Sequence, residues 1–351
     1  MKAVVCYGDG VVHWEEVPTP TPGRGEVRIR VKACGICGSD IPRAMARGAH
    51  SYPIILGHEF SGVVDAVGEG VLSVQTGDRA TAAPLIPCGV CEDCRAGDYA
   101  MCPNYSFVGS RQPGAMAEYV VVPVGNVCSL DASVSFEQGA LIEPATVALH
   151  AVYLSGLKPG GTVAVLGGGT MGVFALQWAR LMGAERIAVF GRDRGHLALS
   201  ERLGADAVFS TLDSDFMAQA MALTGNRGFD TIYEAAGSTA TMRYAFEMAA
   251  KKARLCFIGT PTEDLTFTPR LWERMNRREF TLTGSWMSCS APFPGREWAE
   301  AARRFADGSL RFEDAMFHAK YPMREAQRAF DLFRTPERVK GRVLLVEDGA
   351  K

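Results

Sequence analysis

A glycine-rich segment in the middle of the chain constrains the fold more than any other feature. Residues 162–166, Thr-Val-Ala-Val-Leu, form the continuous apolar run that is typical of a strand buried on both faces. Gly-Gly-Gly-Thr-Met-Gly follows at 167–172 with the spacing G-x-G-x-x-G, and a helical pattern continues to about residue 182. A strand, a glycine turn and a helix in direct succession predict the start of a parallel sheet with crossover helices.

The alternation of strands and helices continues along the chain. A second strand is expected over residues 186–190, a second helix ends near Gly204, and further strands are expected at 231–234 and 254–259. Parallel strands need a long crossover connection, and a helix is its usual form. These residues therefore predict an α/β domain built on a parallel sheet.

The two flanking parts of the chain have different patterns. The first 150 residues contain short alternating runs, such as Glu-Val-Arg-Ile-Arg-Val at 26–31, separated by glycine turns. This pattern is typical of a compact all-β body. After Trp286, a charged helix is expected at about 297–305 and a last strand at 342–346. A chain of 351 residues is long enough for two domains, each with its own core.

The composition argues against several classes of protein. Hydrophobic residues make up 47% and charged residues 22%, which is close to the globular average. The net charge of -2 provides no basic surface for a nucleic acid or an anionic membrane, and no apolar run approaches transmembrane length. The first residues, Met-Lys-Ala-Val-Val-Cys, do not form a signal peptide, so the ten cysteines indicate thiols and metal ligands rather than disulfides. A cytoplasmic location is the simplest expectation.

Four cysteines are clustered in a Gly- and Pro-rich stretch with the spacing C-x2-C-x2-C-x7-C. They are Cys88, Cys91, Cys94 and Cys102. Four thiolates at this spacing can close a tetrahedral shell around zinc and hold together a segment too short to have a core. The alternative is an iron–sulfur cluster, because Pro103 follows the last cysteine, but the last spacing is seven rather than three. We predict a structural zinc site without an open ligand position.

A second set of residues could hold a catalytic metal ion. Cys37 lies in Cys-Gly-Ile-Cys-Gly-Ser-Asp, and His58 is followed by Glu59. A thiolate, an imidazole and a carboxylate suit a zinc ion that keeps one position open for water or substrate. A glycine at position 62 rules out the H-E-x-x-H pattern of metalloproteases. From the residues alone, a structural histidine explains the same pattern equally well. A Cys34/Cys37 redox pair is the other alternative, although this C-x-x-C motif precedes a β-type segment rather than a thioredoxin-like helix.

The glycine segment also indicates a bound dinucleotide. Gly167 and Gly169 would let the backbone approach a pyrophosphate closely, and Thr170, Met171 and Gly172 open the helix whose N-terminus attracts phosphate. A glycine-rich turn without a ligand is the alternative, but the succession of strand, turn and helix favours a dinucleotide.

The end of the second strand indicates which dinucleotide is bound. An NAD site usually carries Asp or Glu there, to accept hydrogen bonds from the ribose 2′-hydroxyl. Here the position is Gly191, with Arg192 and Arg194 beside it, which leaves space and adds cations for a 2′-phosphate. We therefore expect NADP to be favoured, with NAD as the alternative because Asp193 lies close to the usual acidic position.

The motifs in this order resemble those of the zinc-containing medium-chain dehydrogenases. The matching segments cover nearly the whole chain and are 35–40, 57–62, 77–79, the cysteine cluster, Gly114 with 117–119, and 167–172. The resemblance implies an α/β protein with two domains. A GroES-like, β-rich catalytic domain would comprise residues 1–150 and 287–351, with the structural zinc lobe at about 86–104. A Rossmann dinucleotide-binding domain with a doubly wound parallel sheet would comprise residues 151–286.

The same resemblance implies a ligand set for the catalytic zinc. Cys37, His58 and Glu143 would bind the ion, with Glu59 close by, behind these ligands or as an occasional ligand. Glu143, in Ile-Glu-Pro, matches the sorbitol-dehydrogenase-like branch, where simple alcohol dehydrogenases carry cysteine. Together with the cysteine cluster, this predicts two zinc ions per chain.

The implied activity is hydride transfer between a secondary hydroxyl of a polyol, or of a polyol phosphate, and NAD(P). Zinc would lower the pKa of the hydroxyl, and Ser39, two residues after a zinc ligand, would carry the proton away. A turn-forming role is the alternative for Ser39. Pro42 replaces the outer relay histidine of liver-type alcohol dehydrogenases.

Several alternatives and further expectations accompany this activity. Other substrates are L-threonine, a sugar acid or a simple secondary alcohol, and other functions are a zinc-free quinone reductase or a non-catalytic zinc-bearing module. Arg43, His50 and Arg111 are candidates for contacts with a substrate phosphate, with solvated loop charges as the alternative. We expect a polyol or ketose as partner, no nucleic acid or membrane, and assembly as a homodimer or homotetramer.

Overall fold

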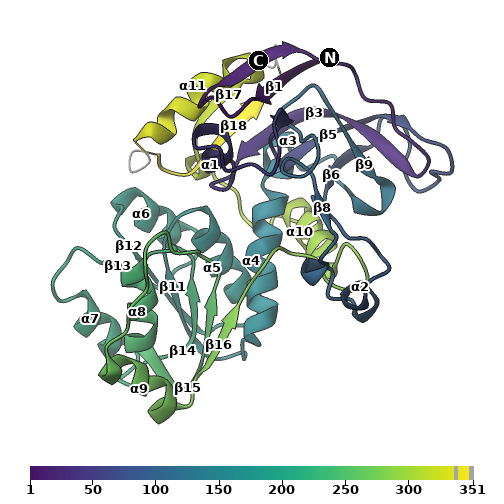
Figure 1. The fold of residues 1–351 in the computed structure, drawn as a ribbon. Helices are drawn as coiled ribbons and strands as arrows, with labels where there is room; N and C mark the ends of the chain where they lie inside the picture. Colours follow the sequence, from purple (N-terminus) through teal and green to yellow (C-terminus); the bar gives the residue numbers. More distant parts are fainter. Residues whose placement is uncertain (336–338, 348–351) are drawn as a thin grey trace. The chain divides into compact units, whose positions relative to one another are not determined.

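The computed structural model describes residues 1–335 and 339–347, which form two compact units (Figure 1). Unit 1 consists of Met1–Glu143 and Ser288–Lys351, and unit 2 of Pro144–Met287. The division falls in the first turn of helix α4 (Ile142–Ser155). Within the described ranges, no helix is both long and apolar enough to cross a membrane.

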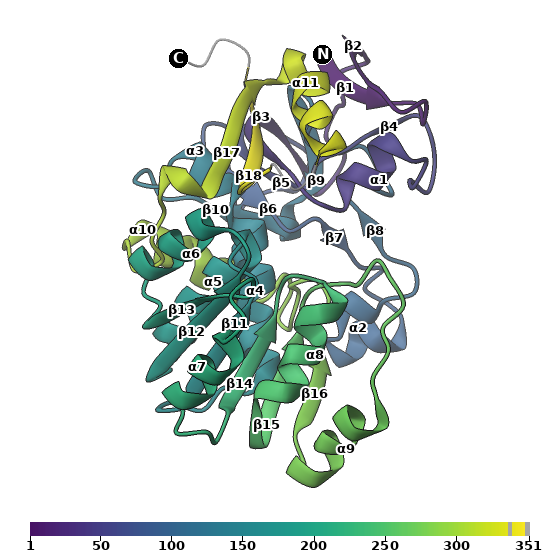
Figure 2. The same ribbon diagram turned by 90° about the vertical axis from the view of Figure 1, so that its left-hand side faces the viewer.

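Unit 2 is the predicted parallel α/β domain (Figure 2). Its six strands have the order β13-β12-β11-β14-β15-β16, and every neighbouring pair is parallel. The strands are β11 (Thr162–Leu166), β12 (Arg186–Gly191), β13 (Ala207–Ser210), β14 (Phe229–Glu234), β15 (Ala249–Phe257) and β16 (Thr281–Gly284). The helices after α4 are α5 (Thr170–Leu181), α6 (Arg194–Arg202), α7 (Phe216–Leu223), α8 (Thr239–Met248) and α9 (Pro269–Arg278).

The centre of this sheet explains why β11 reads as an uninterrupted apolar run. Its last four residues are completely buried, because the strand has a sheet neighbour on each side and helices above and below. The strand order reverses between β11 and β14, which creates a crevice at the carboxyl ends of these two strands. The glycine segment begins at this point.

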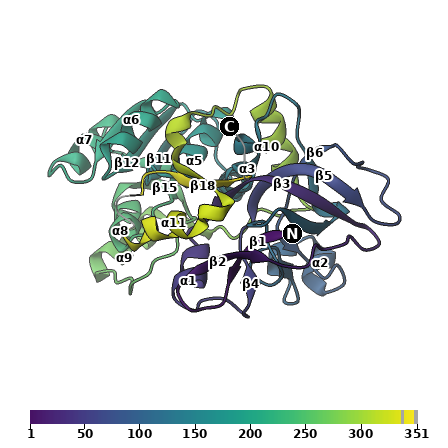
Figure 3. The same cartoon turned by 90° about the horizontal axis from the view of Figure 1, so that it is seen from above.

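Unit 1 is built around one long strand, β3 (Glu26–Ile36). The sheet has the order β10-β6-β5-β3-β18-β17, and β9 also pairs with β3. The other strands are β5 (Glu59–Val67), β6 (Arg79–Ala82), β9 (Tyr119–Pro123), β10 (Val127–Ser129), β17 (Phe317–Pro322) and β18 (Arg342–Val346). Smaller sheets contain β2 (Val12–Glu16), β1 (Lys2–Cys6) and β4 (Ile54–Ile55), and β7 (Leu85–Ile86) with β8 (Ser106–Phe107). The C-terminal strand β18 lies antiparallel to β3, so both ends of the chain build this unit (Figure 3).

The first part of the chain is not all β, and that prediction was wrong for three short segments before α4. These are the helices α1 (Asp40–Met45), α2 (Glu92–Ala96) and α3 (Phe136–Ala140). Local side chains start two of them. Ser135 and Gln138 form a reciprocal capping box at α3, and Cys91 accepts a hydrogen bond from a backbone N–H at α2.

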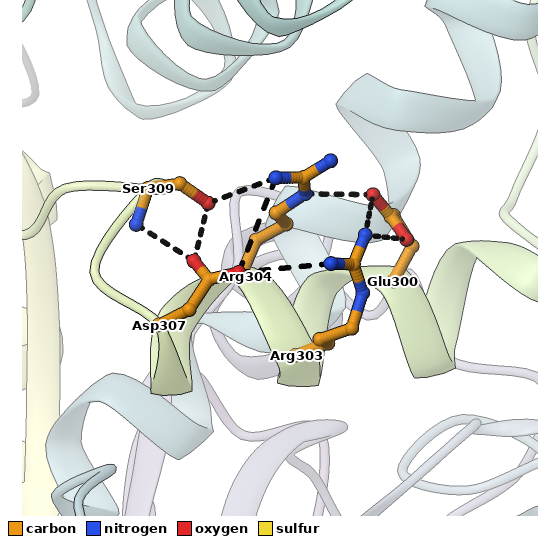
Figure 4. A network of polar contacts seen from close by, with 5 residues as sticks. All are labelled: Glu300, Arg303, Arg304, Asp307 and Ser309. Carbon is orange, nitrogen blue, oxygen red and sulfur yellow. Dashed lines mark hydrogen bonds and ion pairs between the residues drawn. The ribbon is translucent and has the colours of Figure 1, made fainter.

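The predicted charged helix near the C-terminus is α10 (Arg296–Ala306), and α11 (Ala326–Asp331) follows it. The outer face of α10 carries a polar network in which Glu300 binds both Arg303 and Arg304 (Figure 4). Asp307 and Ser309 extend this network at the end of the helix. Because Arg303 and Asp307 are exposed, such pairs contribute little to stability, typically about 0–1 kcal/mol each.

Candidate functional site

The four clustered cysteines converge on one point in unit 1. Their sulfur atoms all lie within 4.8 Å of one another. Cys91 N-caps α2, and Gly97, with φ of 88°, ends the helix and turns the chain back. Backbone N–H groups donate to two sulfur atoms, from Cys94 to Cys91 and from Cys88 to Cys102, each at 3.4 Å. Hydrogen bonds from the amides of Val90 and Cys91 lower the pKa of Cys88 to about 6.

These properties fit a tetrahedral thiolate site for zinc. Four sulfur donors are close enough for one ion. Cys94 and Cys102 are buried, so the site faces into the lobe rather than towards solvent. Four sulfur donors can fill a tetrahedral shell, which is the arrangement expected of a structural rather than a catalytic zinc.

Replacing Cys94 by serine is expected to remove about one equivalent of zinc and to lower the unfolding free energy by at least about 2 kcal/mol, because the binding energy of a structural zinc is folding energy. Metal analysis and thermal unfolding measure the two effects. Cys128→Ser is the matched control, since Cys128 is a half-buried cysteine of the same unit outside the cluster. Unchanged zinc content in Cys94→Ser would contradict the assignment.

A second group of potential ligands contains Cys37, His58 and Glu59. One donor atom of each residue lies within 4.8 Å of the others. The register of the sheet brings them together, since Gly35 of β3 pairs with Glu59 of β5 in antiparallel orientation. Cys37 comes directly after β3, and His58 comes directly before β5. The structure thus joins a thiol, an imidazole and a carboxylate that are separated in the sequence.

Glu143, in the first turn of α4, belongs to the same environment. Its side chain is buried, and burial raises its pKa to about 8. His58 and Arg342 act in the opposite direction and lower the pKa, while the negative charges of Glu59 and Cys37 raise it further. The donor atoms that lie within 4.8 Å of one another are those of Cys37, His58 and Glu59. Glu143 is not among them and lies beside this group.

Arg342 is a member of this site that sequence reasoning missed. Arg342 is the first residue of β18, and the pairing of β18 with β3 brings this side chain next to the group of potential ligands. The buried guanidinium lies with Nε 3.0 Å from Oε2 of Glu59, and its Nη1 donates to the carbonyl of Ile36 at 3.2 Å. An arginine stays charged when buried, so it fixes and balances the Glu59 carboxylate.

Asp40 was also missed as a supporting residue. Its fully buried carboxylate accepts a hydrogen bond from the Cys37 N–H through Oδ2 at 3.0 Å. The other oxygen, Oδ1, lies 3.6 Å from Nδ1 of His58. A carboxylate beside one ring nitrogen orients a histidine so that the other nitrogen can bind a metal ion.

The buried polar atoms of this site fit a metal ion. Asp40 Oδ1 faces His58 Nδ1 at 3.6 Å and Glu59 Oε2 faces Arg342 Nε at 3.0 Å, but none of these four buried atoms makes a well-aligned hydrogen bond. Buried polar groups without such a bond call for an explanation, and a bound ion is one. A thiol, an imidazole and carboxylates are the donor types of a catalytic zinc.

Ser39 lies on the exposed side of this group, immediately before α1. Its side chain makes no capping hydrogen bond, although it occupies the N-cap position. Instead, Nη1 of Arg43 donates to Ser39 Oγ at 2.9 Å. Burial raises the pKa of Cys37 to about 12, and a hydrogen bond from Ser39 to Cys37 partly offsets this effect. The hydroxyl therefore points to the ligand group rather than to the backbone.

Of the three candidate substrate contacts, only Arg43 adjoins the ligand group. Arg43 contacts Ser39 and lies 3.6 Å from Asp40 Oδ1. Arg111 stacks on the ring of Tyr105, with 4.3 Å between the guanidinium carbon and the ring centroid, and His50 is exposed.

The glycine segment in unit 2 has the geometry of a phosphate-binding turn. Gly167 adopts a φ of 113°, which favours glycine, and a Cβ on Gly172 would overlap the carbonyl oxygen of Gly167. Gly169 is the N-cap of α5, and Thr170, Met171 and Gly172 form its first turn. The three glycines at 167–169 line a cavity of about 710 Å³.

The end of β12 forms another side of this cavity. Gly191, Arg192 and Asp193 line it, whereas Arg194 begins α6. The Asp193 carboxylate N-caps α6 by accepting a hydrogen bond from the His196 N–H at 2.9 Å. A Cβ on Gly191 would make ordinary contact with Leu197 at 3.4 Å, so packing does not require glycine there.

Comparisons with known proteins identify the family of this chain. The model of the alcohol dehydrogenase GroES-like domain matches residues 23–132, and that of the zinc-binding dehydrogenase matches residues 170–307. The chain is 39% identical over 347 residues to galactitol 1-phosphate 5-dehydrogenase of Escherichia coli K12, covering 99% of this chain and 100% of that protein.

Two solved structures show the same fold over the full length. The crystal structure of galactitol-1-phosphate dehydrogenase from Escherichia coli has a TM-score of 0.92 at 38% identity, covering 99% of this chain and 100% of that one. A Sinorhizobium meliloti 1021 structure bound to NADP has a TM-score of 0.88 at 30% identity, covering 98% of both chains. This chain belongs to the zinc-dependent alcohol dehydrogenase family and is an oxidoreductase with a GroES-like and a Rossmann-like domain.

Proposed function

We propose that the enzyme transfers hydride between a secondary hydroxyl of a polyol or polyol phosphate and NADP, with two zinc ions per chain. The convergence of Cys37, His58 and the carboxylates of Glu59 and Glu143 beside the Ser39 hydroxyl carries this proposal. Glu143 stands where simple alcohol dehydrogenases carry a cysteine ligand, and this resemblance to the sorbitol-dehydrogenase-like branch favours polyols over simple alcohols. The full-length similarity to a dehydrogenase named for a polyol phosphate supports the same substrate class.

In this proposal Cys37, His58 and Glu143 hold the catalytic zinc. The bound ion supplies Lewis acidity that lowers the pKa of a substrate hydroxyl. Asp40 orients His58, and the ion pair with Arg342 keeps Glu59 behind the ligands.

The proton of the substrate hydroxyl leaves through Ser39. Arg43 donates to one lone pair of Ser39 Oγ, which leaves the second lone pair to accept the substrate proton while the hydrogen of Ser39 is passed on. Pro42 offers no further titrating group, so we propose that solvent receives the proton from Ser39.

The dinucleotide is proposed to occupy the cavity at the carboxyl ends of β11, β12 and β14. The N-terminus of α5 would bind its pyrophosphate, and Arg192 would contact a 2′-phosphate. When bound, the nicotinamide accepts hydride from the substrate carbon.

A substrate screen tests the proposed function directly. Purified zinc-loaded enzyme is mixed with polyols, polyol phosphates, L-threonine, sugar acids and secondary alcohols, and nicotinamide absorbance is followed with NADP and with NAD. The highest kcat/KM is expected for a polyol phosphate, because Arg43 provides a cation beside the ligand group. A clear preference for L-threonine or a simple alcohol would contradict the proposed substrate. Light scattering on the same sample tests the predicted homodimer or homotetramer.

The choice of cofactor gives a second prediction. A good Arg–phosphate contact contributes about 1.5–3 kcal/mol, so NADP should exceed NAD in kcat/KM by roughly tenfold to hundredfold. Gly191→Asp should shift the preference towards NAD, since a Cβ is accommodated there and the carboxylate would repel the 2′-phosphate. Arg192→Ala should weaken NADP and leave NAD unchanged.

The control for these variants lies on the same strand. Arg186 begins β12 at the end away from the cavity, and its side chain donates to the carbonyl of Leu223. Arg186→Ala should leave the ratio of the two cofactors unchanged. A wild-type enzyme that prefers NAD would refute the NADP assignment without affecting the zinc chemistry.

A further inference from the structure

A buried carboxylate at the edge of the dinucleotide cavity has no part in the mechanism above. Glu234 is the last residue of β14, and its side chain is completely shielded from solvent. The strand next to it, β11, carries the glycine turn. Burying a carboxylate costs free energy unless several hydrogen-bond donors compensate for the lost solvation. The identity of these donors therefore shows which parts of the chain the residue holds in place.

Three donors from one turn and one helix bind this carboxylate. The backbone N–H groups of Ala236 and Gly237 donate to Oε1, each at 3.0 Å. The hydroxyl of Thr241, in the first turn of α8, donates to the same oxygen at 2.7 Å. The negative charge therefore lies at the positive N-terminus of α8 and joins the turn at 235–238 to this helix.

The turn that Glu234 holds is a wall of the cavity. Ala235, Ala236 and Ser238 line the same cavity as the glycine segment. The turn also packs on Gly167, because a Cβ there would lie 3.0 Å from the backbone nitrogen of Ala236. In addition, the N–H of Ala235 donates to the carbonyl of Leu166 at 2.9 Å. A shift of the turn would therefore be transmitted to the phosphate-binding loop.

The same residue organises the segment after β15. The N–H groups of Ile258 and Gly259 donate to the backbone carbonyl of Glu234 at 2.8 and 3.1 Å. A Cβ on Gly259 would overlap Gly237 N and lie 2.7 Å from Glu234 Oε2. Glu234 thus stands where the turns that follow β11, β14 and β15 meet.

We infer that Glu234 is a positioning residue for the dinucleotide, and that its carboxylate fixes the turn at 235–238 against α8 before the cofactor binds. The inference rests on the proposed dinucleotide binding. Dinucleotides bind across the carboxyl ends of neighbouring strands and contact several loops at once, so the relative placement of those loops determines the affinity. Because the turn at 235–238 packs on the phosphate-binding loop, we expect Glu234 to act mainly on cofactor affinity.

The experiment measures the NADPH dissociation constant of the zinc-loaded, full-length enzyme by the change in nicotinamide fluorescence. Glu234→Ala should raise this constant about tenfold or more, because three hydrogen bonds to the turn and α8 are lost. Glu234→Gln keeps an oxygen for the two N–H groups, so its increase should be smaller. Turnover at saturating cofactor should stay within about threefold of wild type in both variants, and the KM for the cofactor should follow the dissociation constant.

A matched control separates positioning from general stability. Asp230 is also an acidic residue of β14, at the opposite end of the strand, where it accepts hydrogen bonds from the Thr162 N–H and hydroxyl at 2.9 and 2.8 Å. Asp230→Ala should lower the melting temperature and leave the NADPH dissociation constant unchanged. If Glu234→Ala fails to fold, Thr241→Val removes one donor and should still raise the constant severalfold.

The outcomes distinguish this inference from the proposed function. Wild-type binding with unchanged dissociation constants in the Glu234 and Thr241 variants would refute the positioning role alone. Reduced turnover with an unchanged KM would also refute it. Failure of the wild-type enzyme to bind either dinucleotide would instead contradict the proposed function, and the inference with it.

Discussion

Replacing Glu143 by alanine is expected to lower kcat about 10³-fold or more while the protein stays folded, because Lewis-acid stabilisation contributes several kcal/mol. The carboxylate is buried next to Cys37, His58 and Arg342, which all shift its pKa. Bound zinc would displace the proton that burial favours on this carboxyl, and alanine offers no donor at all. Steady-state kinetics and metal analysis on the same preparation measure both consequences.

The comparison with Glu59 makes this test decisive. Glu59 belongs to the close group of donors, but it is also paired with Arg342 at 3.0 Å. If Glu143 is the ligand, Glu143→Ala should lose about one zinc equivalent. Glu59→Gln should retain the ion but bind it about 10- to 100-fold more weakly. Glu137→Ala is the control, because this glutamate lies in α3 and pairs with Lys320. Full turnover of Glu143→Ala would show that the ligand assignment is wrong.

The cofactor turn could be predicted from the sequence because its signal is local. β11 occupies residues 162–166 and α5 begins at Thr170, as the apolar run and the glycines indicated. The positive φ at position 167 favours glycine, and the close approach of the Gly167 carbonyl leaves no room for a Cβ at position 172. The glycines in the sequence therefore indicate the geometry of the turn. No distant part of the chain is needed to form this turn.

The residue types alone made Cys37, His58 and Glu59 candidate ligands, but Glu143 came only from the resemblance to known dehydrogenases, because the parts of the site are distant in sequence. The antiparallel register of β3 and β5 joins Cys37 to His58, and nothing in either segment specifies that register. Arg342 enters through the pairing of β18 with β3 at the other end of the chain. Its sequence context, an ordinary strand near the C-terminus, gives no sign of a buried partner for Glu59.

The same reasoning explains the short helices that were not predicted. Asp40 looks like a polar loop residue, and only the fold shows that its carboxylate is completely buried between the Cys37 N–H and His58. α1 is six residues long and carries Pro42 in its first turn, which leaves too few positions for a helical period to be recognised. Its role is to deliver Asp40 and Ser39 to the ligand group.

Ser39 is the residue for which we expect the second largest loss. Ser39→Ala should lower kcat by about 10²-fold or more if the hydroxyl carries the substrate proton. The folded state should be little affected, because the side chain is exposed and makes no capping hydrogen bond. Ser39→Thr keeps a hydroxyl at the same position and should restore much of the activity.

The measurement must isolate the chemical step. A deuterium isotope effect on kcat identifies conditions where hydride transfer limits turnover, and under these conditions an unchanged rate in Ser39→Ala would exclude the relay. Since Pro42 provides no further acceptor, small buffer bases should partly rescue Ser39→Ala and should leave wild type unaffected. Arg43→Ala removes the donor that holds Ser39 Oγ, so it should lower the rate less than Ser39→Ala does. Because Arg43 would also bind a substrate phosphate, its loss should raise KM as well, and a loss of kcat larger than that of Ser39→Ala would contradict the relay.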